Sequence, residues 1–258
     1  MKQTLIVFLS LCIIVMCCCP IGAIENDLST EIALQESSTP DDLGHQIAAI
    51  MQTYFDDPEG TKSALNSIGV DLLDEPQIIS YNSTNQERGL NPTDYTLSVY
   101  SARRAGSKNT YLMWSLQANK TELFPGPLDY ISMEWDTEYA SYYSSTGDDV
   151  FSTVQGRDDG IVLFNVQDND LDKNESTYGY VIVSPKKTGW MEYGSKYVHT
   201  YTKFLFGGSA SASFSPSTEV SDSGEMSLNL AYTMGFTVTV GANTAQWQIW
   251  NDNAVDLD

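Results

Sequence analysis

Hydrophobic and polar residues alternate with one period near the start of the chain and with another from about residue 77 onward. In the first stretch, apolar side chains recur at the three- and four-residue spacing of one helical face. They are Leu43, Ile47, Ile50, Met51 and Tyr54. The preceding Thr39-Pro40-Asp41-Asp42 supplies an N-cap, a proline in the first turn and two acids. We therefore expect a helix from about residue 39.

The segment Asp56-Asp57-Pro58-Glu59-Gly60 breaks this run and can cap a second, shorter helix that carries Ala64, Leu65 and Ile68. Gly69 is placed to end this helix. Two short helices bury too little apolar surface to form a core of their own. Residues 39–74 are thus expected to form a helical hairpin that packs on a larger body.

From there to the end of the chain, apolar and polar residues alternate in short runs, and clusters of Gly, Asn, Asp and Ser separate the runs. Such alternating sets are Tyr95, Leu97 and Val99; Leu112, Trp114 and Leu116; Ile131, Met133 and Trp135; and Phe236, Val238 and Val240. No helical run intervenes. The pattern predicts roughly ten antiparallel strands in a two-sheet β-sandwich, similar to a jelly roll, over residues 75–258.

Residues 1–23 have the composition of an export signal. Lys2 is their only charge, Leu5–Met16 is an almost unbroken apolar run, and Ala23 offers the small residue that signal peptidase requires. The apolar run is shorter than the about 20 residues that span a bilayer. We expect cleavage and export, with no membrane span after cleavage. A retained signal anchor and a lipid-modified cysteine are the alternatives.

The segment that follows, residues 24–38, is polar and acidic and is expected to be a flexible linker. Three N-x-S/T sequons begin at Asn82, Asn119 and Asn174. Sequons of this kind accept glycans on the solvated loops of exported proteins. Together with the leader, they predict a secreted or cell-surface glycoprotein.

Acidic residues outnumber basic ones, with 34 Asp and Glu against 13 Lys and Arg and a net charge of −21. The basic residues are scattered, whereas nucleic acid requires a concentrated basic face. We therefore expect no nucleic-acid partner. All four cysteines lie in the leader, at Cys12, Cys17, Cys18 and Cys19. The remainder of the chain thus has no disulfide and no thiolate metal site.

The segment 129–138 is the richest in candidate chemistry. If it is a strand, it places Glu134, Asp136 and Glu138 on one face and apolar residues on the other. Two neighbouring carboxylates suit glycoside hydrolysis, because crowding raises the pKa of one acid while the other stays ionised. The same pattern also fits a solvated strand face whose acids pair with Lys or Arg across the sheet.

The spelling Glu134-Trp135-Asp136-Thr137-Glu138 resembles the E-x-D-x-E catalytic strand of the jelly-roll endo-β-glucanases related to lichenase. In that family the first Glu is the nucleophile and the last is the acid/base. The resemblance therefore implies these roles for Glu134 and Glu138, with Asp136 between them. It is confined to this short stretch of the chain.

Asp168, Asp170 and Asp172 alternate in a loop between two predicted strands, in the manner of the first ligands of a calcium loop. The turn glycine and the final glutamate of that pattern are absent, so a solvated hairpin turn is the alternative. Ca²⁺ is nevertheless the cofactor that we expect if there is one. Zinc would depend on two histidines, His45 and His199, that lie far apart in the sequence.

Trp135 and Trp250 are the candidates for a platform on which sugar rings stack, with core packing as the alternative. No nucleophile elbow and no glycine-rich phosphate motif occurs, so no catalytic set is complete. We expect an exported β-sandwich protein that acts by binding or adhesion at a cell surface rather than as an enzyme. Its expected partner is an envelope glycan or a surface protein. The alternatives are a secreted glycoside hydrolase and a purely structural envelope component.

Overall fold

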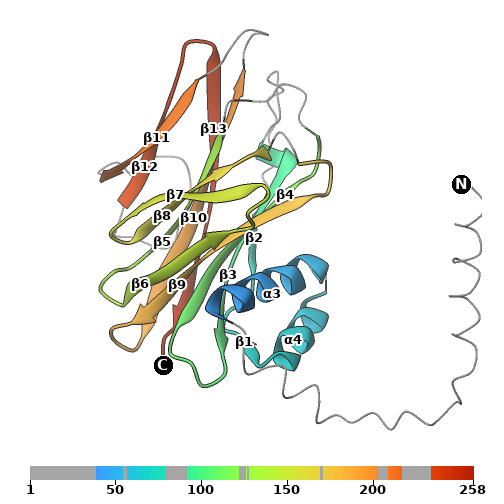
Figure 1. The fold of residues 1–258 in the computed structure, drawn as a ribbon, viewed down its shortest axis with the longest axis vertical. Helices are drawn as coiled ribbons and strands as arrows, with labels where there is room; N and C mark the ends of the chain where they lie inside the picture. Colours follow the sequence, from blue (N-terminus) through green and yellow to red (C-terminus); the bar gives the residue numbers. More distant parts are fainter. Residues whose placement is uncertain are drawn as a thin grey trace, which may run out of the picture. The chain divides into compact units, whose positions relative to one another are not determined.

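The computed structural model describes residues 39–54, 57–79, 92–121, 126, 128–168, 171–202, 209–216 and 234–258. The predicted leader and linker, and the sequon at Asn82, lie outside these residues. The described residues all belong to the unit Ser38–Asp258. Within it, the expected mainly β fold, with two antiparallel sheets and two N-terminal helices, is confirmed (Figure 1).

Both helices begin where their capping residues predict. In α3 (Pro40–Thr53), the Thr39 hydroxyl accepts a hydrogen bond from the Asp42 amide at 3.2 Å, and the Asp42 carboxylate accepts one from the Thr39 amide at 3.1 Å. In α4 (Pro58–Ser67), the carboxylate of Asp57 accepts a hydrogen bond from the Gly60 amide at 3.0 Å. Gly69 follows α4 with a φ of 71°, in the left-handed region that favours glycine.

The first sheet has six strands, and every pairing in it is antiparallel. They are β1 (Val70–Leu72), β2 (Gln77–Ile79), β3 (Tyr95–Arg104), β4 (Thr110–Ala118), β6 (Ala140–Gly147) and β9 (Ser176–Pro185). Their order is β1-β3-β4-β9-β6, and β2 pairs with β3 as well. β1 lies inside the range predicted as a helical hairpin, so the first sheet begins earlier than the alternation in the sequence indicates.

The second sheet has five strands, again antiparallel, in the order β13-β10-β5-β8-β7. Their bounds are β5 (Asp129–Trp135), β7 (Ser152–Asp158), β8 (Ile161–Val166), β10 (Trp190–Thr202) and β13 (Thr244–Asp256). A separate two-stranded ribbon consists of β11 (Ala210–Pro216) and β12 (Met234–Val240). A short 3-10 helix, η2 (Pro92–Asp94), leads into β3.

The main core lies between the two sheets. The ring of Trp114 packs edge-on against Phe164, with 5.3 Å between ring centroids. Gly179 leaves room for that indole, because a Cβ there would lie 2.6 Å from it. The alternating sets predicted to face the core on β4 and β5 do so; they are Leu112, Trp114, Leu116, Ile131, Met133 and Trp135.

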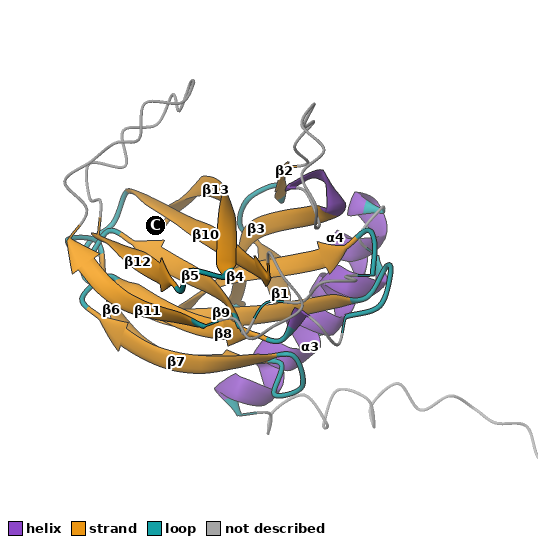
Figure 2. Ribbon diagram, turned by 90° about the horizontal axis from the view of Figure 1, so that it is seen from above, coloured by secondary structure: helices purple, strands orange, loops and turns teal. Residues whose placement is uncertain are grey.

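The helices cover the outer face of the first sheet, as Figure 2 shows. Gly44 lets α3 approach closely, because a Cβ at this position would lie 2.3 Å from the ring of Tyr180. The hydroxyl of Tyr180 donates a hydrogen bond to the Asp41 carbonyl at 3.0 Å, and Tyr111 donates one to the Pro40 carbonyl at the same distance. These contacts fix α3 to β4 and β9.

The β11–β12 ribbon covers part of the outer face of the second sheet. Phe236 and Val238 of β12 pack with Tyr130 and Leu163 in a second apolar cluster. The amine of Lys196 donates a hydrogen bond to the Phe236 carbonyl at 2.9 Å. Along the part of the chain that the structure describes, no helix combines the length and the apolar character needed to cross a membrane.

Candidate functional site

The predicted row of carboxylates along one strand is only partly formed. β5 ends at Trp135, and Asp136 begins a turn in which its carboxylate accepts a hydrogen bond from the amide of Glu138 at 2.8 Å. The expected alternation of Glu134, Asp136 and Glu138 on one strand face is therefore wrong beyond Trp135. At the position where the pattern predicts a continued strand, the carboxylate of Asp136 stabilises a turn instead.

Glu134 lies on the outer face of the second sheet and is partly buried. Its carboxylate accepts a hydrogen bond from the Ser132 hydroxyl at 2.7 Å. Burial raises the pKa of Glu134 to about 7, and the Ser132 hydrogen bond and the charge of Lys196 oppose this rise. Burial also lowers the pKa of Lys196. Glu134 thus has the raised, near-neutral pKa that is typical of a general acid.

Glu138 has different surroundings. It is exposed in the turn after β5 and forms an ion pair with Lys187 at 3.3 Å. Asp136 is partly buried and is engaged by the turn. The structure therefore directs Glu134 and Glu138 to separate partners, the first on the sheet face and the second in the turn.

The two tryptophans of the predicted platform also lie in different surroundings. Trp135 is buried in the core and its indole donates a hydrogen bond to the Ala140 carbonyl at 3.3 Å, so its ring face is not available to solvent. Trp250 is partly buried on β13, opposite Lys196 of β10. Trp190 is the exposed tryptophan of the described residues, at 66 %.

The two predicted calcium ligands that the structure describes differ in burial. Asp168 is buried, Asp172 is exposed, and Asp170 lies outside the described residues. Of the two described sequon asparagines, Asn119 is partly buried and its amide donates a hydrogen bond to the Thr96 hydroxyl at 3.2 Å. Asn174 is exposed in a turn with a φ of 70°.

Asp168 instead joins two residues from distant parts of the chain. Asp129 begins β5, Asp168 follows β8, and His199 lies in β10; all three are at most 3 % exposed. Nδ1 of His199 lies 2.7 Å from a carboxylate oxygen of Asp129 and 3.0 Å from one of Asp168. The pairing of Tyr130 with Val198 places Asp129 beside His199. We call Asp129, Asp168 and His199 the buried triad.

Neighbouring groups complete the hydrogen bonding of the buried triad. Tyr197 donates its hydroxyl to Asp129, and Tyr95 donates its own to Asp168 at 2.8 Å. Burial, and then the charge of Asp168, raises the pKa of Asp129 well above its usual value. Burial also acts to raise the pKa of Asp168, but the hydrogen bond and charge of His199 bring it below the usual value.

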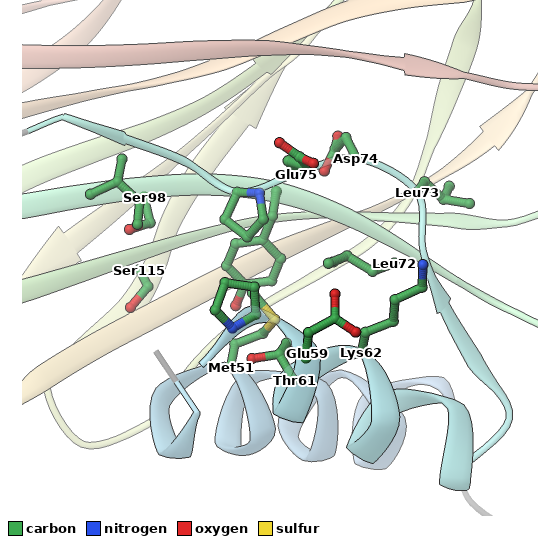
Figure 3. Close-up of a pocket in the computed structure, with 14 residues that line it drawn as sticks. Met51, Glu59, Thr61, Lys62, Leu72, Leu73, Asp74, Glu75, Ser98 and Ser115 are labelled. Atoms are coloured by element: carbon green, nitrogen blue, oxygen red, sulfur yellow. The ribbon is translucent and has the colours of Figure 1, made fainter. Parts of the chain in front are cut away.

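A pocket of about 460 Å³ lies between the helices and the first sheet (Figure 3). Its floor is the outer face of the sheet, with Ser98 and Tyr100 from β3 and Ser115 from β4. Its walls come from α3, α4 and the connection between β1 and β2. The apolar side chains that line it are Met51, Pro58, Leu72, Leu73, Pro76 and Ile78.

Two hydroxyls on the floor of this pocket are buried without a partner. Ser98 is 3 % and Tyr100 1 % exposed, and neither hydroxyl has a hydrogen-bond partner among the residues that the structure describes. A buried polar group in this state costs about 1–3 kcal/mol. Burial also raises the pKa of Tyr100, so its hydroxyl keeps its proton and remains a hydrogen-bond donor.

Beside the pocket, β1 and β2 pair with separate parts of β3. β1 pairs with Ala102–Arg104 and β2 with Leu97–Val99. In the gap, the carboxylate of Asp74 accepts hydrogen bonds from the amide and the hydroxyl of Ser101, at 2.8 and 2.7 Å. Asp74 thereby replaces the missing strand contact, and burial raises its pKa.

The charged side chains of the pocket are mostly acidic. Glu59 and Lys62 come from α4, and Asp74 and Glu75 come from the connection between β1 and β2. Glu59, Lys62 and Glu75 are exposed. Figure 3 shows Glu59 and Lys62 on the helix side and Asp74 and Glu75 on the opposite side. The acidic majority favours neutral or cationic ligands over anions.

Comparison with known proteins gives no family. No protein-family model and no curated protein matches the chain. Among solved structures, the chain is similar to the sixth cohesin of scaffoldin B from Acetivibrio cellulolyticus, solved in complex with a Cel5 dockerin. The identity is 9%, the TM-score is 0.24, and the match covers 34% of this chain and 74% of that one. A structure named BspA_C_WT is 8% identical with a TM-score of 0.23, over 40% of this chain and 54% of that one. Neither similarity carries a functional conclusion.

Proposed function

We propose that this chain is an exported or cell-surface β-sandwich protein that acts by non-covalent binding, with its ligand in the pocket between the helices and the first sheet. The observation that supports the proposal is the pair of buried hydroxyls, Ser98 and Tyr100, which line the pocket without a partner among the described residues. A ligand whose polar groups bond to these hydroxyls removes the cost of leaving them unsatisfied. Export rests on the predicted leader, residues 1–23.

The lining of the pocket defines a class of ligand. A volume of about 460 Å³ lies within the range of small-molecule sites and corresponds to about 15 molecules of liquid water, so a single ordered water does not fill it. Side chains such as Met51, Leu72 and Ile78 favour an apolar body. The two hydroxyls favour hydroxyl, carbonyl or ether groups on that body. The class is therefore a compact uncharged amphiphile.

For an exported protein, such an amphiphile is a component of the cell envelope. In this proposal its apolar part enters the pocket, and its glycan or other polar part remains at the mouth, beside Glu59 and Glu75. This retains the envelope partner that the sequence predicts and assigns it a place in the fold.

The hydrolase alternative has one observation in its favour, the pKa of Glu134 at about 7. Its second carboxylate, Glu138, is exposed and paired with Lys187. We therefore expect no release of reducing sugar when the purified protein is incubated with a panel of β-glucans. Release of sugar that disappears in Glu134→Gln would establish the hydrolase instead.

The binding proposal is tested with N-phenyl-1-naphthylamine, an uncharged dye whose fluorescence rises in apolar surroundings. We expect saturable binding of one dye molecule per chain. Ser98→Leu fills the floor of the pocket and should weaken binding at least tenfold. The matched control is Ser213→Leu, which adds the same side chain at an exposed position of β11. It should leave dye binding unchanged.

Displacement of the dye by 1-heptanol tests the hydrogen-bonding part. Tyr100→Phe keeps the shape of the side chain, so it also serves if Ser98→Leu does not fold. It should weaken heptanol binding roughly three- to tenfold, because about 0.5–1.5 kcal/mol is the net worth of one hydrogen bond. The proposal is rejected if Ser98→Leu binds the dye as the parent chain does, or if Tyr100→Phe leaves heptanol binding unaltered.

A further inference from the structure

We propose that the buried triad, Asp129, Asp168 and His199, binds one divalent transition-metal ion between the two sheets. The three candidate ligand atoms, two carboxylate oxygens and one imidazole nitrogen, all lie within 4.8 Å of one another. They come from two strands and from the segment after a third, so the fold itself brings them together. The site is separate from the pocket and does not depend on it.

The three ligand atoms lie close enough together to bind the same ion. Nitrogen and oxygen ligands bind zinc at about 2.0–2.2 Å in a tetrahedral arrangement, so two ligands of one ion lie about 3.3–3.6 Å apart. Nδ1 of His199 is 2.7 Å from Asp129 and 3.0 Å from Asp168. Both separations are shorter than this, so binding requires Asp129 and Asp168 each to move outward by about 0.3–0.9 Å. The hydroxyl of Tyr197, 3.3 Å from Nδ1 of His199, lies beside the same point.

The charge of a divalent cation matches that of the two carboxylates of the buried triad. Among the described residues, His199 is the one basic group that pairs with Asp129 or Asp168. A negative charge that is shielded from water is strongly unfavourable unless it is compensated. A divalent cation balances the two carboxylates, and the protons that the triad held pass to solvent when the ion binds.

Contacts around the triad orient its members in the way that outer groups orient metal ligands. The amide of Thr200 donates a hydrogen bond to Oδ1 of Asp129 at 2.7 Å, which leaves Oδ2 directed at His199. Tyr95 fixes Asp168 with a hydrogen bond of 2.8 Å. The ring of Trp247 packs against His199, with 4.7 Å between ring centroids.

The ligand set selects the kind of ion. A histidine nitrogen with carboxylate oxygens suits zinc, manganese or ferrous iron, whereas Ca²⁺ requires six to eight oxygens. Thiolates have no part in the site, because all four cysteines lie within residues 1–23. The metal expected from the sequence was Ca²⁺ at Asp168, Asp170 and Asp172. In this proposal Asp168 keeps its role with different partners and a different ion.

The test uses the purified full-length protein with its leader cysteines alkylated and with zinc as the probe. After dialysis against zinc and removal of the excess, we expect about one zinc per chain by mass spectrometry of the metal. Zinc at 100 times its Kd should raise Tm by about 5–10 °C, EDTA should reverse this, and Ca²⁺ should have no effect.

The two histidines provide a matched pair of variants. His199→Gln should lose the bound zinc and its effect on Tm. His45→Gln removes the only other histidine, whose Nδ1 lies 2.8 Å from the Tyr178 hydroxyl on the helix side of the first sheet, and it should retain both. Absence of zinc from the parent chain, or the same zinc content in both variants, overturns the proposal.

A measurement on the parent chain covers the case in which His199→Gln does not fold. Co²⁺ added to the metal-free protein should give a visible spectrum typical of nitrogen and oxygen ligands of low coordination number. A spectrum equal to that of aqueous Co²⁺ would contradict the proposed site.

Discussion

The two faces of β3 hold their buried polar groups in opposite ways. Tyr95 and Tyr100 lie on the same strand, and each is 1 % exposed. The Tyr95 hydroxyl, on the inner face, bonds to Asp168 of the buried triad, whereas the Tyr100 hydroxyl, on the outer face, lines a pocket and has no partner among the described residues. In the triad the protein's own groups satisfy one another. In the pocket the buried hydroxyls are available to hydrogen-bond to a ligand.

This difference separates two uses of buried polarity. A closed cluster of charges holds its members in place and loses stability when any one of them is removed. An open set of hydroxyls reduces the stability of the empty protein and recovers it when a ligand binds. Mutations in the two regions should therefore change stability by different amounts, and even in different directions.

The largest difference is expected between Asp129→Ala and Ser98→Ala, both measured by urea unfolding in EDTA so that bound metal does not contribute. Asp129→Ala removes the acceptor of Tyr197 and Thr200 and should cost about 3–5 kcal/mol. Ser98→Ala removes a hydroxyl that has no partner and should be neutral or slightly stabilising. Equal losses in the two variants would show that the two regions do not differ.

A second prediction concerns Glu134, which lies outside both regions and has a single hydrogen bond from Ser132. Its pKa is about 7 in the folded protein, against 4.5 as the ordinary value. Between these pH values the folded chain holds a proton that the unfolded chain has released, so stability falls as pH rises. Because Glu134 is partly buried, we expect a loss of about 1–3 kcal/mol between pH 4.5 and 7.5.

Denaturant unfolding at several pH values checks this slope. Glu134→Gln should flatten it relative to the parent chain, while the matched Glu138→Gln changes an exposed acid and should leave it in place. The attribution to Glu134 fails if both variants keep the slope of the parent chain. In that case the buried triad, whose Asp129 also has a raised pKa, is the source.

Much of the fold could be predicted from local pattern, because caps and alternation are local properties. Thr39 and Asp57 begin their helices as expected, and the residues that alternate along β4 and β5 face the core. The limit of this approach appears at Asp136. The alternation in the sequence continues past Trp135, but Asp136 accepts a hydrogen bond from the Glu138 amide and turns the chain.

The two sites could not be predicted in the same way, because both depend on contacts between distant segments. Asp168 was found through its loop spacing, but Asp129 and His199 join it only through the pairing of β5 with both β10 and β8. The alternation of Tyr197, His199 and Tyr201 on one strand face was the available signal. Ser98 resembles an ordinary solvated strand position, and it becomes a buried pocket residue only because α3 and α4 cover that face.

The most discriminating prediction replaces each tyrosine of β3 with phenylalanine. Tyr95→Phe removes a hydrogen bond to a charged group and should cost about 1.5–3 kcal/mol. Tyr100→Phe removes a hydroxyl that has no partner among the described residues, so in the ligand-free protein it should change stability by about 0 to 1 kcal/mol in the stabilising direction. The two tyrosines share the strand, the residue type and the degree of burial. The difference between the two free-energy changes therefore measures the contribution of the hydrogen-bond partner. A loss in Tyr100→Phe as large as that in Tyr95→Phe would mean that the Tyr100 hydroxyl is already satisfied, and the pocket would lose the feature that marks it as a binding site.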